Sequence, residues 1–203
     1  MRGPDTVGGR EVPDRVVVGQ VVKLQVQRNR LRTGDKYSLD HLSEVSALRL
    51  TPDGAIGFDG ASWVIDCHHR AHPSAVPYKP ERVLSIGFSS HYEYMWRMFE
   101  PIPFGAAGEN LIVQTDRLIR LEDVKRGIRI ESSTDTALIR TVAVAEPCVA
   151  FTRLVTGRPD ARAADILEER NCLREGVRGF VMALDGIDNF DVSPGDRVSI
   201  PTG

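Results

Sequence analysis

The chain has 203 residues, of which 41% are hydrophobic and 27% are charged, the proportions of an ordinary globular domain. Its 26 basic and 28 acidic residues give a net charge of -2, which provides no general attraction for polyanions, so we expect no nucleic-acid partner. No apolar stretch approaches the roughly 18 residues that a membrane-spanning helix needs, so we expect no membrane partner either.

The N-terminal residues and the cysteines indicate the domain organisation and the compartment. Residues 1–14 contain Gly, Pro and Asp and lack the apolar stretch of a secretory signal, and we interpret them as a disordered leader before one domain over residues 15–203. Cys67, Cys148 and Cys172 are too few and too scattered for a disulfide framework. An odd number also leaves at least one thiol unpaired within the chain, which favours a cytoplasmic location.

The first predicted elements are a strand and a basic loop. Apolar and polar residues alternate near the end of residues 15–27, which is typical of a half-buried strand. Residues 28–37 then form a loop with a Gly34-Asp35 turn signal, which we interpret as solvated. The alternative is a small anion site made by three arginines of this loop, Arg28, Arg30 and Arg32.

A hairpin and a long loop come next. Residues 47–58 place Pro52-Asp53-Gly54 between two short apolar stretches, which predicts a β-hairpin. Residues 59–80 show no regular pattern, and we expect a long, mobile surface loop that borders the functional concavity. The loop contains Cys67, His68, His69 and His72.

The middle of the chain predicts a buried strand over residues 82–88, followed directly by a helix up to Phe99. Ser90 and Glu93 have the spacing of a capping box. Four large residues fall on one helical face, which indicates packing against the core; they are Tyr92, Met95, Trp96 and Phe99.

The remaining segments predict further short strands and a second full helix. Gly, Pro and Asp signals separate the strands, and the strand that starts at Thr136 ends at Pro147-Cys148, a suitable way to place a thiol at a barrel rim. The predicted elements are strands over residues 111–113, 128–131, 136–148, 179–184 and 197–200, a helical turn over 121–126, and a helix over 160–175 with Ala163, Ile166, Leu167 and Leu173 facing inward.

The order of these elements decides the predicted fold class. Strands outnumber helices and do not alternate regularly with them, as a parallel α/β sheet would require. We therefore predict a mainly β, β-rich α+β protein: a closed or nearly closed mixed β-barrel with two or three peripheral helices.

Three segments carry a resemblance to a known family. Residues 104–111 (FGAAGENL) form a Phe-Gly turn followed by Gly-Glu-Asn-Leu, Pro147-Cys148 follows one strand later, and Arg178-Gly179-Phe180 leads to residues 192–198 (VSPGDRV). In this order they resemble the MOSC family, the domain named after the C-terminal part of molybdenum-cofactor sulfurases. Ser90-His91-Tyr92 shows a fainter likeness.

The resemblance implies a mixed β-barrel and a role in handling molybdenum cofactor or sulfur. The Pro-Cys cysteine, here Cys148, would be the sulfur carrier or the metal ligand, and a thiolate suits both roles because it is a nucleophile and a soft ligand. The implied activities are a molybdenum-cofactor-dependent oxidoreductase or a sulfur transferase, with a protein partner for sulfur or electron transfer. The alternative is that Cys148 has no chemical role and is a small buried core residue.

The candidate residues for binding the cofactor lie in two segments. Gly108, Glu109 and Asn110 belong to the Gly-Glu-Asn-Leu turn, and the long loop adds three more, His68, His69 and Arg70. The chain departs from the cofactor-handling members at three places. It has Gly57-Phe58-Asp59 instead of Gly-Asp-x-His, Tyr78-Lys79-Pro80 instead of His-Gly-Gly, and Ala145-Glu146 where an Arg precedes the Pro-Cys.

Other chemistries remain open from the residues alone. A non-catalytic barrel could use its pocket for a small anionic ligand or a protein partner. Cys67, His68, His69 and His72 are zinc-type ligands, although their spacing differs from that of the usual paired knuckles. A thiol hydrolase would need Cys148 next to His91 as base and Glu109 as its orienting partner.

Overall fold

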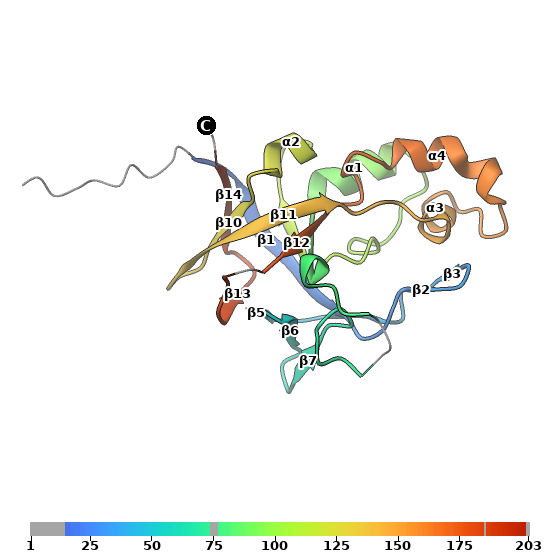
Figure 1. The fold of residues 1–203 in the computed structure, drawn as a ribbon. Coiled ribbons are helices and arrows are strands. Elements are labelled where there is room, and N and C mark those ends of the chain that lie inside the picture. Colours follow the sequence, from blue (N-terminus) through green and yellow to red (C-terminus); the bar gives the residue numbers. More distant parts are fainter. Residues whose placement is uncertain (1–14, 74–76, 185, 202–203) are drawn as a thin grey trace, which may run out of the picture.

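The computed structural model describes residues 15–73, 77–184 and 186–201, so the predicted leader lies outside the described part of the chain. The centre of the molecule is a barrel of seven strands (Figure 1). These strands are β1 (Arg15–Gln27), β8 (Leu84–Phe88), β9 (Leu111–Gln114), β10 (Ile128–Glu131), β11 (Thr136–Val144), β12 (Phe180–Ala183) and β14 (Arg197–Pro201).

The strand pairing closes the barrel. Around it the order is β1, β14, β10, β11, β12, β8 and β9, and β9 pairs again with β1. Strands β8 and β9 are parallel, with Ile86 opposite Leu111, whereas the other barrel pairs are antiparallel. Full closure leaves the barrel no free edge. The predicted fold class, a β-rich mixed barrel with peripheral helices, is therefore confirmed.

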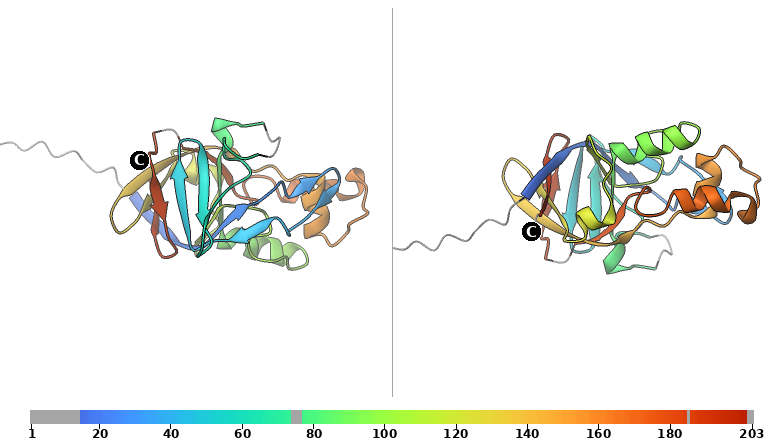
Figure 2. Two further views of the ribbon diagram at one scale, coloured as in Figure 1. Left: turned by 90° about the horizontal axis from the view of Figure 1, so that it is seen from below. Right: turned by 90° about the horizontal axis from the view of Figure 1, so that it is seen from above.

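A smaller sheet covers one side of the barrel. It has the order β13 (Phe190–Val192), β5 (Ala47–Thr51), β6 (Gly54–Phe58) and β7 (Trp63–Ile65), and it lies across the barrel in the view from below (Figure 2). The predicted hairpin is confirmed as β5 and β6. Strand β7 corrects the prediction of a structureless loop over residues 59–80, because it pairs with β6 and extends the sheet.

Three short strands lie outside these pairings. Strand β4 (Leu42–Glu44) pairs with the end of β1, and β2 (Arg32–Thr33) pairs with β3 (Lys36–Tyr37). The β2–β3 hairpin lies at the same end of the molecule as α3 (Val149–Val155) and α4 (Leu167–Cys172), away from the C-terminus (Figure 1). Contact between the Tyr37 and Phe151 rings, whose centroids are 5.6 Å apart, joins the hairpin to α3.

The described residues form four α-helices, more than the two or three predicted. They are α1 (Ser89–Met98), α2 (Leu121–Val124), α3 and α4, with 3₁₀ turns at Pro80–Arg82 and Ala163–Ile166. Helix α3 was missed because its residues are mostly β-branched or aromatic and its N-cap is Cys148 instead of the usual Ser, Thr, Asp or Asn. The predicted inner face of the second helix is half correct: Ile166 and Leu173 are buried, whereas Ala163 and Leu167 are exposed.

Helix α1 begins differently from the prediction. It continues directly from β8, so Phe88 is its N-cap and Ser90 lies inside the helix without a hydrogen bond from its Oγ. The predicted capping box is therefore wrong. The Ser89 hydroxyl instead donates to the Thr115 carbonyl at 3.1 Å and ties the helix to the end of β9.

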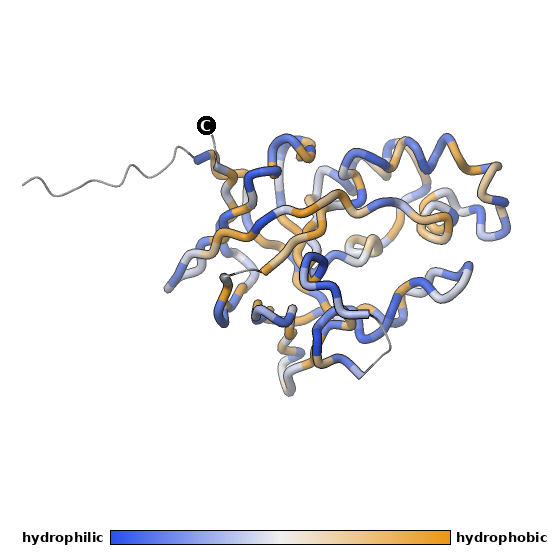
Figure 3. Tube along the Cα trace, viewed as in Figure 1, coloured by the Kyte–Doolittle hydropathy of each residue, from blue (hydrophilic) through white to orange (hydrophobic). Residues whose placement is uncertain are grey.

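The apolar residues form two cores. One fills the barrel and the space under the small sheet, and the other lies outside the barrel between α1, α3 and residues 102–107. Hydrophobic stretches follow the barrel strands in the hydropathy trace (Figure 3). Among the described residues, no helix is long and apolar enough to cross a membrane. The second core fixes α3 against the barrel and so fixes the position of Cys148.

Candidate functional site

Cys148 lies where the chain passes from β11 into α3. Its backbone is extended, and its Sγ accepts a hydrogen bond from the Phe151 N–H at 3.4 Å, so the sulfur caps the first turn of the helix. The residue is partly exposed, whereas Cys67 is buried and Cys172 is exposed on α4. Cys148 thus combines a fixed sulfur position with access to solvent.

The Cys148 side chain lines a cavity of about 720 Å³ at the end of the barrel. The walls come from the end of β1, the β2–β3 hairpin, the start of β8, the Gly108–Asn110 turn and the link from β11 to α3. The long loop contributes His68, Pro77 and Lys79 to the same cavity. This confirms that the loop borders the concavity of Cys148; its mobility stays a prediction.

Basic side chains dominate the charge of this larger cavity. Five arginines and lysines line it, against the carboxylates of Glu109 and Glu146. The five cations are Arg30, Arg32, Lys79, Arg82 and Arg178. Grouped cations in a partly enclosed space create a local field that attracts anions, even though the chain as a whole carries a net charge of only -2.

Arg178 is the cation held by the most contacts. Its Nη1 donates to the Glu146 carbonyl at 2.8 Å, and its guanidinium lies 4.7 Å from the centroid of the Phe151 ring. Its buried Nε has no hydrogen-bond partner among the described residues. The backbone of Glu146 therefore holds Arg178 in the wall that also contains Cys148.

A buried carboxylate fixes the position of His68. Asp66 is fully buried, and its Oδ1 accepts from the His68 backbone N–H and from His68 Nδ1, each at 2.9 Å. Its Oδ2 accepts from the Gln27 backbone N–H at 2.8 Å and from Asn110 Nδ2 at 2.9 Å. The carboxylate therefore joins the long loop to β1 and to the Gly108–Asn110 turn.

The Asp66–His68 pair also sets the charge of the imidazole. Burial is the largest single influence and works against a charged ring, but the hydrogen bonds and charges of Asp66 and Cys67 together outweigh it and raise the pKa of His68 to about 10. Burial alone would raise the pKa of Asp66, and the hydrogen bonds from His68 and Gln27 bring it below its ordinary value. His68 is therefore a cation at neutral pH and adds to the positive charge of the cavity.

Glu109 is the second acid of interest in the wall. It is buried, its Oε2 accepts from the Tyr92 hydroxyl at 2.8 Å, and its Oε1 has no partner among the described residues. Burial raises the pKa of Glu109 to about 7, against the opposing hydrogen bonds from its own backbone and from Tyr92. Near neutral pH this carboxyl is therefore partly protonated, and it repels an anionic ligand less than an ordinary glutamate does.

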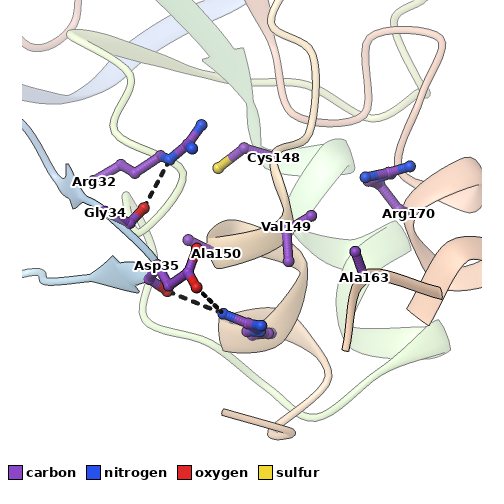
Figure 4. A pocket seen from close by; sticks show the side chains of 9 residues that line it. Arg32, Gly34, Asp35, Cys148, Val149, Ala150, Ala163 and Arg170 are labelled. Atoms are coloured by element: carbon purple, nitrogen blue, oxygen red, sulfur yellow. Dashed lines mark hydrogen bonds and ion pairs between the residues drawn. The ribbon is translucent and has the colours of Figure 1, made fainter. Parts of the chain in front are cut away.

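A smaller cavity of about 360 Å³ lies on the α3 side of Cys148. Figure 4 shows the Cys148 sulfur pointing toward Arg32, with Arg170 farther away, beyond Val149. Arg32, Gly34 and Cys148 line both cavities. Cys148 therefore contributes to the walls of both cavities.

The structure assembles some of the predicted site residues and separates others. Cys148, His68 and the Gly108–Asn110 turn all line the larger cavity. His69 and Arg70 do not: Arg70 lies 3.6 Å from Asp53 and points over the Tyr78 ring. They are turned away because the loop bends at Asp66–His68, where the side chain of His68 faces the cavity and the following residues fold back toward the small sheet.

The Gly108–Asn110 turn forms part of the cavity wall, but its hydrogen-bond donors bond mainly to other groups of the protein instead of facing a ligand. The Gly108 N–H donates to the Gly105 carbonyl at 3.0 Å, and the Asn110 N–H donates to the Ser85 carbonyl at 2.9 Å. Both Asn110 side-chain atoms are also engaged, with Ser85 and Asp66 among their partners. The N–H groups of Gly108 and Asn110 are therefore not available to stabilise a thiolate at Cys148.

The zinc and hydrolase alternatives receive little support from the geometry. Ligand atoms of Asp66, Cys67 and His68 lie within 4.8 Å of one another, but each Asp66 oxygen already accepts two hydrogen bonds. His91 is buried, and its Nε2 lies 2.8 Å from the Ile119 carbonyl. It does not line either cavity, so it cannot serve Cys148 as a base.

Several residues of the site carried no recognisable signal in the sequence. Tyr37 and Arg82 are single residues in segments predicted as loop or strand, and only the folded chain brings them into the wall that contains Cys148. Asp66 lies in a predicted loop and reaches the site through its hydrogen bonds to His68. Of the three arginines of the alternative anion site, Arg30 and Arg32 line the larger cavity, and anion binding there stays a prediction. Arg28 does not join them; it pairs with Asp59 at 3.6 Å.

Comparisons with known proteins identify the fold but no family. No protein-family model and no curated protein matches the chain. The solved structure of YuaD from Bacillus subtilis is similar, with a TM-score of 0.59 and 16% identity over 95% of this chain and 100% of that one.

Two further solved structures are more distant. A hypothetical protein has a TM-score of 0.50 and 18% identity over 91% of this chain and 68% of its own. YiiM from Escherichia coli has a TM-score of 0.45 and 17% identity over 91% of this chain and 70% of its own. At such low identity the first two similarities concern the barrel fold alone.

Proposed function

We propose that the protein is a MOSC-type barrel that binds a small anionic ligand in the larger cavity, with the Cys148 thiol as the group that ligates or reacts with it. The ligand implied by the family resemblance is the molybdenum cofactor. The observation that carries the proposal is the position of a partly exposed cysteine in the wall of a cavity lined by Arg30, Arg32, Lys79, Arg82 and Arg178.

The charge of the cavity supports an anionic ligand. Arg178 lines the cavity with its guanidinium, and His68 is held protonated by Asp66 and Cys67. Hydrogen bonds between charged groups are about twice as strong as neutral ones, and guanidinium groups match phosphate and carboxylate geometry. A ligand with a phosphate group would therefore gain more from this cavity than a neutral ligand of the same size.

The sulfur of Cys148 is suited to a soft metal or to sulfane sulfur. A thiolate prefers thiophilic metals and is the nucleophilic form of cysteine. Here the Phe151 N–H and the nearby Arg32 provide positive partners for that form. Cys67, by contrast, is buried, and Cys172 lies on the exposed face of α4.

The residues present fit the molybdenum cofactor in two respects. The cavity has a volume of about 720 Å³, within the range of small-molecule sites. Its five cations could hold the phosphate of a pterin. When bound, the cofactor would supply a redox-active metal, and Cys148 would be the protein ligand to it.

A second candidate, the sulfur carrier, is favoured by one specific observation. Cys148 lines both cavities, so its thiolate could attack the outer sulfur of a persulfide donor on one side, with the donor leaving as a thiolate. The outer sulfur of the resulting Cys148 persulfide could then pass to a nucleophile on the other side, which regenerates the Cys148 thiolate. The implied class is then a sulfur transferase in place of an oxidoreductase, and the protein partner would be the sulfur donor or acceptor.

The first experiment measures what the purified protein carries. Protein from a host that makes the cofactor should contain molybdenum, measured by mass spectrometry, and pterin, measured by fluorescence after oxidation. Cys148→Ser should lose molybdenum at least tenfold, and Arg178→Gln should lose both, because one lost charge-assisted contact costs about 2 kcal/mol. Cys172→Ser is the control and should match the wild type.

The results separate the candidates. Wild-type protein without molybdenum and pterin would contradict cofactor binding. In that case the carrier hypothesis predicts one cyanide-releasable sulfur per chain after incubation with a sulfur donor, present in Cys172→Ser and absent in Cys148→Ser. If that sulfur is absent as well, Cys148 has neither role, and the protein is a non-catalytic barrel.

A further inference from the structure

The smaller cavity next to Cys148 has the composition of an anion site. Its charged lining consists of Arg32, Arg153, Arg170 and Asp35, so three guanidinium groups face one carboxylate. The cations come from three different elements, namely β2, α3 and α4. Like charges brought together by tertiary structure repel one another unless a counter-anion lies between them.

The single carboxylate does not neutralise the cluster. Asp35 has a side chain that is 85% exposed, and its Oδ2 lies 3.9 Å from Arg153. The Arg153 Nε is already used, because it donates to the Ala161 carbonyl at 2.8 Å. This bond holds the Arg153 guanidinium in place and leaves part of its donor capacity for a ligand.

Arg170 provides the independent observation. The residue is partly exposed, and its guanidinium extends from α4 toward the cavity (Figure 4). Arg170 lines this cavity and not the larger one, so its charge is available to a ligand here. Arg32 uses its Nε for the Gly34 carbonyl at 3.0 Å, which orients the rest of its guanidinium toward the space beside Cys148.

We propose that the smaller cavity is a second ligand site, distinct from the larger one, which binds a tetrahedral oxyanion of the phosphate and sulfate class between Arg32, Arg153 and Arg170. Its volume of about 360 Å³ accommodates one such group with water. The bound oxyanion lies beside the Cys148 sulfur. It therefore selects, for any reaction at this thiol, molecules that carry a compact anionic group.

The site is independent of the proposed function, and the lining residues allow separate tests. Arg170 and Arg153 line only the smaller cavity, whereas Arg178 and Arg82 line only the larger one. Arg170→Gln should therefore impair oxyanion binding without changing the ligand content of the larger cavity. Arg178→Gln should do the reverse.

The first measurement is calorimetric titration of the wild-type protein with inorganic phosphate at low ionic strength. Arg170→Gln should weaken phosphate binding at least tenfold. Arg126→Gln, which removes an equal charge from an exposed position between α2 and β10, should leave the affinity within twofold. Equal binding by Arg170→Gln and Arg126→Gln, or no binding by the wild type, would overturn the proposal.

The second measurement uses the cysteine as a reporter, in a Cys172→Ser background so that the exposed thiol does not react. The rate of Cys148 alkylation by anionic iodoacetate is compared with that by neutral iodoacetamide. An oxyanion site predicts that phosphate slows the iodoacetate reaction at least fivefold and that Arg170→Gln lowers the preference for iodoacetate. A phosphomonoester too large for the smaller cavity should protect less than inorganic phosphate; equal protection would place the anion in the larger cavity instead.

Discussion

The buried carboxyl of Glu109 gives the sharpest test of the site electrostatics. Its pKa is raised from the ordinary value of 4.5 to about 7 in the folded protein, mainly by burial. Between these pH values the unfolded chain releases a proton that the folded protein keeps. The free energy of unfolding therefore falls as pH rises through this window, by about 1.4 kcal/mol per pH unit from this group.

The expected size follows from the same values. Above pH 7 the ionised Glu109 costs the folded state about 3 kcal/mol relative to pH 4.5. Glu109→Gln removes the titration and keeps an acceptor for the Tyr92 hydroxyl, which donates to Glu109 at 2.8 Å. Any cost of the new amide group is the same at every pH, so the stability difference between variant and wild type isolates the carboxyl.

The assay is urea unfolding of wild type and Glu109→Gln at intervals between pH 5 and pH 8. As pH rises across this range, the wild type should lose about 2 to 3 kcal/mol of unfolding free energy relative to Glu109→Gln, most of it below pH 7. Glu146→Gln, at an exposed position, is the matched control for the loss of one carboxyl group. Parallel profiles for wild type and Glu109→Gln would refute a raised pKa at Glu109.

Three further results are expected from the same protein. Gly108→Ala should lower the free energy of unfolding by about 2 kcal/mol or more, because Gly108 has a φ of +88° and an added Cβ would meet a leucine carbon at 2.5 Å. Gly195→Ala is the control for backbone strain alone: Gly195 has a φ of +94° but nothing within 4 Å of an added Cβ, so this variant should cost less. Asp66→Asn should lower the unfolding free energy by about 3 kcal/mol at pH 7, with a smaller effect in acid where the carboxylate is protonated; a loss that does not change with pH would count against the ion pair. In NMR titrations the imidazole of His91, whose pKa burial lowers to about 4, should stay neutral from pH 6 to pH 8 while His68 stays protonated. Midpoints near 6.5 for both rings would contradict these assignments.

The sequence by itself determined the strands and their class. The alternation within residues 15–27, the Pro52-Asp53-Gly54 turn and the glycine and proline signals around the later strands are local, and they predict β1, the β5–β6 hairpin and β14. Helix α3 and strand β7 were not predicted, because their short segments combine β-branched and aromatic residues with no capping or periodic signal. Their conformations depend on packing partners that are distant in sequence.

The site residues show the same difference between local motifs and contacts that are distant in sequence. The Pro147-Cys148 dipeptide and the Gly-Glu-Asn-Leu turn are contiguous, so the sequence identified Cys148 and Glu109 as candidates. His68 was identified with two neighbours, His69 and Arg70, that the structure turns away from the cavity. Which of three adjacent polar residues faces the cavity depends on where Asp66 finds its buried partners, and those lie on β1 and in the Gly108–Asn110 turn.

Only the tertiary structure decided the charge around Cys148. Arg32, Arg170 and Arg178 are separated by more than a hundred residues at the extremes, and each looks like an ordinary surface arginine in its own segment. Barrel closure brings Arg178 to the carbonyl of Glu146, and packing of α3 against the second core places Arg170 and Arg32 in the wall of one cavity with Cys148. A local field of this kind is a sum over positions in space, so neither the net charge nor any single motif could predict it.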